Sequence, residues 1–158
     1  MPKTITDGFT PYIGTKEYNG IIADIQKWFY DTKDLVRAPW CASSVSYFAN
    51  EVGILDQIGG KNDNVCNMEN ATRKAWMKDG KGQFLRREDI TKGTTIPRGT
   101  ICFMLWSGEM KVDNPHKHAT TVNKDFTWKG SGYFEALGGN QDDMIKVCNY
   151  SQAKIHAL

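Results

Sequence analysis

The residues of this chain that could carry covalent chemistry are few, and they follow one another in the order Cys, His, Asn. Cys41 comes directly after Pro39 and Trp40 and opens a segment with helical periodicity. A helix N-terminus carries partial positive charge, which favours the nucleophilic thiolate over the thiol. Val45 and Phe48 lie four and seven positions later, so Cys41 shares their apolar face and its sulfur is expected to point toward whatever the helix packs on. The alternative is a small buried hydrophobic residue.

A cysteine nucleophile needs a base, and the chain contains three histidines. His156 lies two residues from the last residue, where fraying is common. His116 follows a turn-like Val-Asp-Asn-Pro stretch, whereas His118 begins a β-rich segment, a rigid position for a general base. Side chains two apart share a strand face, so parity leaves both histidines open. As an HxH pair they could also bind a metal, but no third ligand is placed nearby, so we expect neither metal nor cofactor.

The imidazole of a Cys-His pair usually needs a third group that orients it. Asn140 lies in a turn-rich stretch after a predicted strand, and its amide oxygen is a suitable acceptor for the ring N–H of His118. Glu135, Asp142 and Asp143 are rival candidates. Asn140 also has a purely structural interpretation, because asparagine beside two glycines is typical of a turn.

The elements expected to position these residues form an α+β layout within one domain, residues 1–158. Residues 1–17 are expected to be irregular, and helices are expected over 18–30, 41–52 and 70–77, the last capped by Asn70. Antiparallel strands are expected over 100–106, 117–123, 133–137, 144–147 and 153–157, with 138–143 as a hairpin connection.

Composition excludes several classes of function. The net charge of +2 gives no reason to expect nucleic acid as a partner. The sequence contains no run of 18 apolar residues, so we expect no transmembrane helix and no membrane partner. The N-terminal residues lack the apolar stretch of a secretory signal. The four cysteines form no CxxC pair, so we expect no zinc site built from cysteines. We expect a monomer that is synthesised in the cytoplasm.

Four blocks of sequence resemble the CHAP domains, the cysteine, histidine-dependent amidohydrolases/peptidases of the papain-like superfamily. The matching blocks are Pro39-Trp40-Cys41-Ala42, Pro97-Arg98-Gly99-Thr100-Ile101-Cys102-Phe103, His118-Ala119-Thr120-Thr121-Val122 and Leu137-Gly138-Gly139-Asn140-Gln141. The blocks stand in the family's order, and the part of the chain that the resemblance covers runs from residue 39 to about residue 148. Many relatives carry an acidic residue two positions before the Asn, where this chain has Gly138. Some relatives bind calcium before the nucleophile, but here Asp31 and Asp34 are the only acids in that loop, so no calcium is expected.

The resemblance implies a papain-like fold, with N-terminal helices packed on a C-terminal antiparallel sheet, and catalysis by Cys41, His118 and Asn140. It implies hydrolysis of an amide bond in bacterial peptidoglycan, by a muramoyl-L-alanine amidase or a peptide endopeptidase. A phage-type endolysin that reaches the cell wall after release is the first expectation. The alternatives are an antibacterial amidase effector delivered by a secretion system, with a cognate immunity protein, a catalytically inactive wall-binding module, and a cysteine protease acting on ordinary proteins.

Overall fold

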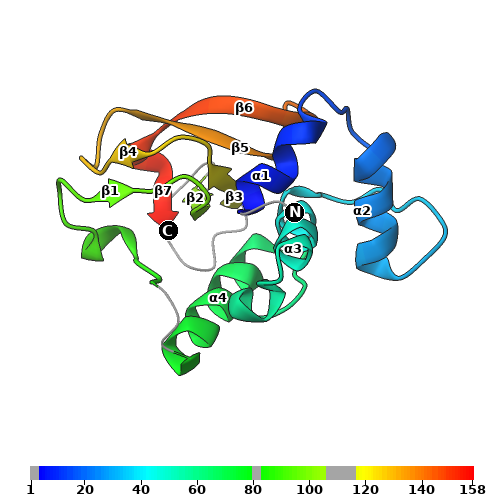
Figure 1. The fold of residues 1–158 in the computed structure, drawn as a ribbon, viewed down its shortest axis with the longest axis horizontal. Coiled ribbons are helices and arrows are strands. Elements are labelled where there is room, and N and C mark those ends of the chain that lie inside the picture. The colour runs from blue at the N-terminus through cyan, green and yellow to red at the C-terminus, as the bar shows by residue number, and fades with distance from the viewer. Residues whose placement is uncertain (1–3, 80–82, 106–116) are drawn as a thin grey trace.

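The computed structural model describes residues 4–79, 83–105 and 117–158 (Figure 1). The helices are α1 (Ile5–Phe9), α2 (Gly20–Tyr30), α3 (Cys41–Glu51) and α4 (Val65–Asp79), with single 3₁₀ turns η1 (Thr10–Tyr12), η2 (Leu55–Ile58), η3 (Arg87–Asp89) and η4 (Gln152–Lys154). The strands are β1 (Thr95–Ile96), β2 (Ile101–Leu105), β3 (Lys117–Val122), β4 (Phe126–Thr127), β5 (Tyr133–Gln141), β6 (Met144–Ser151) and β7 (Ile155–Ala157). The expected α+β class, helices first and strands second, is confirmed.

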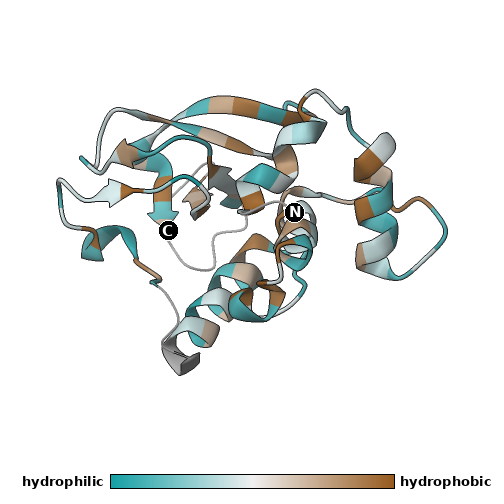
Figure 2. Ribbon diagram, viewed as in Figure 1, coloured by the Kyte–Doolittle hydropathy of each residue, from teal (hydrophilic) through white to brown (hydrophobic). Residues whose placement is uncertain are grey.

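The main sheet has the strand order β6-β5-β3-β2-β7, and every neighbouring pair in it is antiparallel. α1 and α3 contact β3 and β5, and α4 contacts β3, so these helices gather on one side of the sheet (Figure 1). Figure 2 shows hydrophobic and hydrophilic residues alternating along α2, α4 and β6, as expected for elements that bury one face.

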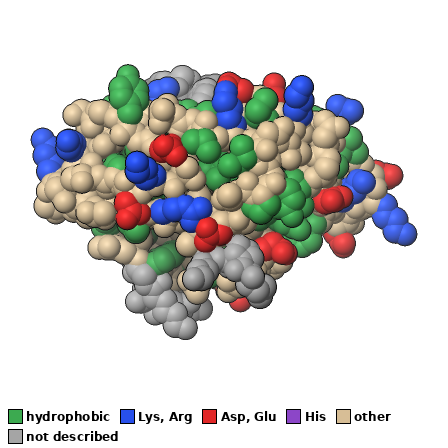
Figure 3. All heavy atoms as spheres, turned by 45° about the horizontal axis from the view of Figure 1, so that its top comes forward, with side chains coloured by type: hydrophobic (Ala, Val, Ile, Leu, Met, Phe, Trp, Pro, Cys, Tyr) green, Lys and Arg blue, Asp and Glu red, His purple; other side chains and the backbone are tan. Residues whose placement is uncertain are grey.

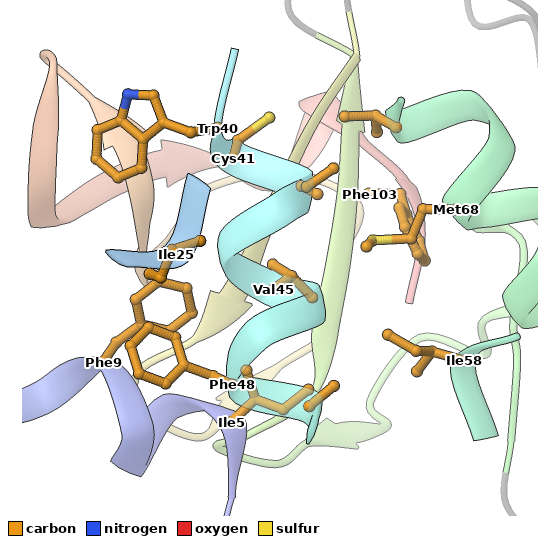
Figure 4. Packing of buried hydrophobic residues seen from close by; sticks show 14 of the residues in the cluster. Ile5, Phe9, Ile25, Trp40, Cys41, Val45, Phe48, Ile58, Met68 and Phe103 are labelled. Carbon is orange, nitrogen blue, oxygen red and sulfur yellow. The ribbon is translucent and has the colours of Figure 1, made fainter. Parts of the chain in front are cut away.

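The sheet buries hydrophobic residues on both of its faces. Phe103 of β2 packs in the cluster beneath the helices, with Val45 and Met68 (Figure 4). Its neighbours Cys102 and Met104 belong to a second cluster, as the alternation of side chains along a strand requires. β3 therefore lies between two cores, and all six of its residues are buried. This burial gives His118 and its neighbours a rigid position.

The N-terminal residues are more ordered than the sequence pattern predicts. Residues 1–17 were expected to be irregular, but α1 and η1 occupy residues 5–12. Thr4 and Asp7 form a reciprocal capping box, in which each side chain accepts from the other residue's backbone N–H. Arg98 Nη1 lies 2.5 Å from Asp7 Oδ1 and fixes the helix to the loop before β2.

The helix expected from Asn70 begins earlier. α4 starts at Val65, and Asn64 Oδ1 accepts a hydrogen bond from the backbone N–H of Asn67 at 3.1 Å, so Asn64 and not Asn70 satisfies a free N–H of the first turn. The strand expected over 153–157 is present as β7, and His156 lies in it and is buried, so the expected fraying at this position is wrong.

Within the described ranges, no helix is both long enough and apolar enough to cross a membrane. Figure 3 shows basic and acidic side chains interspersed over the face it presents.

Candidate active site around Cys41

Cys41 is the first residue of α3, as the sequence pattern predicts. The preceding Trp40 is fully buried, and its indole Nε1 donates to Glu17 Oε1 at 3.3 Å. Figure 4 shows the Trp40 ring and the Cys41 sulfur on opposite sides of the start of α3. The large ring therefore anchors the entry to the helix and leaves the thiol on the other side.

A buried glutamine holds the loop that leads to Cys41. Gln26 of α2 donates from Nε2 to the carbonyl oxygen of Ala38 at 3.1 Å, and its Oε1 accepts from Ser43 Oγ at 2.8 Å. Tyr18 donates its hydroxyl to the same Ala38 carbonyl at 3.3 Å. Because this loop lacks regular structure, these bonds replace the ladder that would otherwise fix its backbone.

The Cys41 thiol lies against β3, and only 7% of the residue is exposed. Backbone hydrogen bonds at Ala119, Ala42 and Cys41 itself lower the pKa of the thiol, but burial outweighs them and leaves its pKa above the usual value. The expectation of a thiolate favoured by the helix N-terminus is therefore corrected: desolvation decides, and the resting group is a thiol. The sulfur therefore lies against β3 one residue from His118, but Ala119 pairs with Phe103 on the helix side, whereas the His118 side chain leaves the strand on the face of its register partner Met104.

The hydrogen bonds of Gln141 determine the tautomer of His118. Gln141 Nε2 donates to the carbonyl oxygen of Lys146 at 2.5 Å, so its Oε1 must be the atom that faces His118 Nε2, at 3.2 Å. An amide oxygen only accepts, hence His118 Nε2 carries the proton. In the neutral ring Nδ1 is then unprotonated. Thr120 Oγ1 donates to the same Gln141 oxygen at 2.8 Å and helps to hold it.

His118 has the properties of a base that stays neutral at ordinary pH. Burial lowers its pKa from 6.5 to about 4, and the hydrogen bond with Gln141 opposes this shift. The ring of Tyr150 on β6 meets the imidazole edge-on, with 6.1 Å between ring centroids. Burial also raises the pKa of Tyr150, and the nearby Cys148 and Cys41 thiols act in the same direction. Tyr150 thus adds a neutral phenol beside the site.

Gln141, and not Asn140, is the amide that the structure places on His118. The β5–β6 register shifts between Gly138 and Gln141, where Asn140 adopts a left-handed conformation with φ of 56°. This bulge inserts one residue, so Gln141 takes the sheet face that simple alternation assigns to Asn140. The orienting role of Asn140 stays a prediction. Gln141 is the last residue of the Leu-Gly-Gly-Asn-Gln motif, but a sequence pattern that assumes regular alternation does not predict a bulge.

The two glycines of this motif have no room for a side chain. A Cβ at Gly138 would lie 2.4 Å from Thr120 Oγ1, and one at Gly139 would lie 2.6 Å from the Trp40 ring and 2.5 Å from Ser44 Oγ. Because Gly138 and Gly139 have no side chains, β5 can lie close to both β3 and the start of α3. The glycines therefore serve close packing at the site more than turn formation.

Gly139→Ala is expected to lower the free energy of unfolding by about 1–3 kcal/mol, because the new methyl group overpacks against the rigid Trp40 ring. Urea unfolding followed by circular dichroism measures this. A Trp40→Phe change shortens the ring, so the Gly139→Ala/Trp40→Phe double variant should lose less than the sum of the two single losses. Simple additivity would show that the two residues do not interfere.

Protonation of His118 is expected to destabilise the fold in a defined pH window. Above about pH 6.5 the imidazole is neutral in the folded and in the unfolded protein. As the pH falls, the unfolded chain binds a proton first, because the folded chain binds one only near pH 4. The wild type should therefore lose about 3 kcal/mol of stability between pH 7 and pH 4 through this group. Urea unfolding at several pH values, compared with His118→Gln, isolates the effect. Parallel pH curves for the two proteins would contradict it.

The other candidates occupy separate places. His116 lies outside the described residues, and His156 contacts Glu69 and Lys117 on the helix side of the sheet. Glu135 accepts from Asn123, and Asp142 pairs with Lys146 at the surface. Over the described ranges there is no cluster of three or more His, Cys, Asp or Glu side chains suited to a metal ion.

No disulfide joins the four cysteines, all of which lie in the described ranges; Cys41 and Cys102 are buried, and Cys66 and Cys148 are half-buried. Burial raises the pKa of the Cys102 thiol, which lies in β2 without exposure. Among the cysteines, Cys41 alone begins a helix and lies beside the strand that carries His118.

Comparison with models of protein families, with curated proteins and with solved structures finds no match for this chain.

Proposed function

We propose that this protein is a cysteine hydrolase that cleaves an amide bond in bacterial peptidoglycan. The observation that supports it most is the meeting of Cys41 and β3. The thiol at the start of α3 contacts the backbone of Ala119, and the preceding His118 has its proton held on Nε2 by Gln141. A neutral thiol and a neutral imidazole with an unprotonated Nδ1 are the resting forms of a pair that, in this proposal, ionises when substrate arrives.

In the proposed reaction, the Cys41 proton moves to His118 Nδ1 as the sulfur attacks the amide carbonyl carbon. The resulting oxyanion is stabilised by backbone N–H groups at the start of α3, such as that of Cys41. Collapse breaks the C–N bond, and the imidazolium returns its proton to the departing amine, which leaves a thioester. Water then adds with His118 as base, and the carboxylic acid leaves while the thiol is regenerated.

The choice of peptidoglycan rests on the resemblance of the Cys41, His118 and Leu137–Gln141 blocks to CHAP domains. A papain-like CHAP fold is part of this proposal, and the α+β layout with helices packed on an antiparallel sheet is compatible with it. We propose the muramoyl–L-alanine bond or a peptide bond of the stem or bridge as the target. A phage-type endolysin is the proposed setting, and an injected amidase effector is the alternative, which a copurifying immunity protein would favour.

A catalytically inactive wall-binding module is the alternative of another class, and one observation favours it. Cys41 is nearly buried and its pKa is raised, which is what an inert structural thiol would also show. Binding to cell walls without release of any product would support this alternative. Turnover of unfolded protein without action on walls would instead indicate an ordinary cysteine protease.

The deciding experiment is mass spectrometry of purified peptidoglycan after incubation with wild type or Cys41→Ala. Soluble fragments that appear only with the wild type are expected. A free lactyl end on muramic acid with a new L-alanine amine identifies an amidase, and a cut stem or bridge identifies an endopeptidase. Equal fragments from both proteins would overturn Cys41 as nucleophile, and no fragments from several wall types would overturn the hydrolase.

A further inference from the structure

A pocket with a volume of about 300 Å³ lies between α4, the turn η2 and the segment that leads into β2. Its lining includes Ile54, Ile58, Trp76, Phe84, Ile96 and Phe103. No charged side chain lines it within the described part of the chain. The volume is at the lower end of the range for small-molecule sites and is too small for a helix or a strand of a partner protein.

This pocket is separate from the candidate active site. Ile54 and Ile58 follow the C-terminal end of α3, whereas Cys41 begins the helix. Eleven residues of helix at about 1.5 Å each place the two ends about 16 Å apart. Figure 4 shows Ile58 near the end of α3 opposite to Cys41. Substrate held at Cys41 therefore does not explain the pocket.

The wall of the pocket contains a hydrogen-bond donor without an acceptor. Trp76 Nε1 is the one buried side-chain N or O atom, among the described residues, that has no hydrogen-bond partner. The hydroxyls of Thr72 and Thr100, which also line the pocket, already donate to the backbone carbonyls of Met68 and Pro97. A buried unpaired donor is unfavourable by about 1–3 kcal/mol, so this indole N–H requires an explanation.

We propose that the pocket binds a small, neutral, largely apolar molecule whose single oxygen accepts the hydrogen bond of Trp76 Nε1. The apolar lining fits the body of such a molecule. Because no charged side chain lines the pocket, a ligand with an ionic group would find no partner for it there. The indole N–H only donates, so it selects a ligand that carries an acceptor such as a carbonyl oxygen. Gln57, Gln83, Thr94 and Thr95 also line the pocket, so an ordered water is the competing occupant, and a preference for a carbonyl-bearing probe over its methylene analogue distinguishes the two.

The test compares two probes of nearly equal shape, acetophenone and α-methylstyrene, which differ in having a carbonyl oxygen or a methylene group. The readout is the indole ¹H–¹⁵N signal of Trp76, identified as the signal that is missing from Trp76→Phe. Acetophenone should move this proton downfield and bind about five- to tenfold more tightly than α-methylstyrene, the ratio that one hydrogen bond provides. In Trp76→Phe, which keeps an aromatic wall but lacks the N–H, the two affinities should become equal.

A blocking variant provides the second control. Ile54 is half-buried at the edge of the pocket, so Ile54→Trp should fill it, keep the circular dichroism spectrum and abolish binding of both probes. Equal binding of the two probes to the wild type would overturn the role of the indole. Absence of binding at millimolar concentrations, with an unchanged Trp76 signal, would overturn the site. Neither result depends on whether Cys41 is a nucleophile, and the wild-type comparison stands even if a variant fails to fold.

Discussion

Glu69→Ala will lower the free energy of unfolding by about 3–5 kcal/mol, the loss typical of a buried ion pair that is deprived of one partner. Glu69 of α4 is 3% exposed, and its two carboxylate oxygens contact Lys117 Nζ of β3 and His156 Nδ1 of β7. The Lys117 side chain is wholly buried and lies 3.2 Å from His156 Nδ1. Removal of the carboxylate leaves an ammonium group in the core without its counter-ion.

Urea unfolding at pH 7, followed by circular dichroism, measures this loss. Asp142→Ala is the matched control, because Asp142 also pairs with a lysine but its side chain is 71% exposed. That variant should lose less than about 1 kcal/mol. A Glu69→Leu/Lys117→Met double variant removes both charges and should recover much of the stability that Glu69→Ala loses. Equal losses for Glu69→Ala and Asp142→Ala would show that the buried pair contributes no more than a surface pair.

This cluster illustrates which interactions the sequence does not reveal. Lys117 and Glu69 are 48 positions apart, and His156 is 87 positions from Glu69. No local pattern relates them, and a lysine at the start of a strand is usually assigned to solvent. The topology buries all three where α4 crosses β3 and β7, so their pairing follows from tertiary structure alone.

The elements that the sequence did predict are those with strong local signals. α3 was predicted over 41–52 and is found at Cys41–Glu51, because apolar residues recur at helical spacing and Pro39 precludes an earlier start. β2, β3 and β7 also lie within one or two residues of their predicted bounds. β5 and β6 are longer than predicted, since the Gly-Gly stretch reads as a turn when its packing partners are unknown. The true turn is Asp142 and Asp143, both with positive φ, in a two-residue hairpin.

The sequence predicts where the candidate residues lie, but their catalytic roles stay predictions. Cys41 is found at the start of a helix and His118 in a strand, as expected, whereas the choice between Asn140 and Gln141 depends on the bulge. The protonation state of the thiol was also misjudged, because helix-terminal charge can be inferred from sequence but burial cannot. Tyr150 was missed for a related reason: it reaches His118 from β6, a strand whose place in the sheet follows from the fold.

Under the proposed function, His118→Ala is expected to reduce peptidoglycan turnover by about 10²–10⁴-fold, the range typical of removing a general base. Gln141→Leu keeps the volume but removes the acceptor for His118 Nε2–H, and a smaller loss of about tenfold is expected from one hydrogen bond. Asn140→Ala should lose less than Gln141→Leu if the structure's pairing is the functional one. The rates come from release of soluble wall fragments at fixed enzyme concentration.

The pH profile separates an orienting role from a merely structural one. His118 must be unprotonated to accept the thiol proton, so the acid limb of kcat/KM should lie near its pKa of about 4 and activity should fall as pH drops through that value. Gln141→Glu puts a negative charge beside the ring, which favours imidazolium and should move the limb to higher pH. Gln141→Leu should move it lower, since the native hydrogen bond raises the His118 pKa. An Asn140 variant that shifts the limb while Gln141 variants leave it in place would return the orienting role to Asn140.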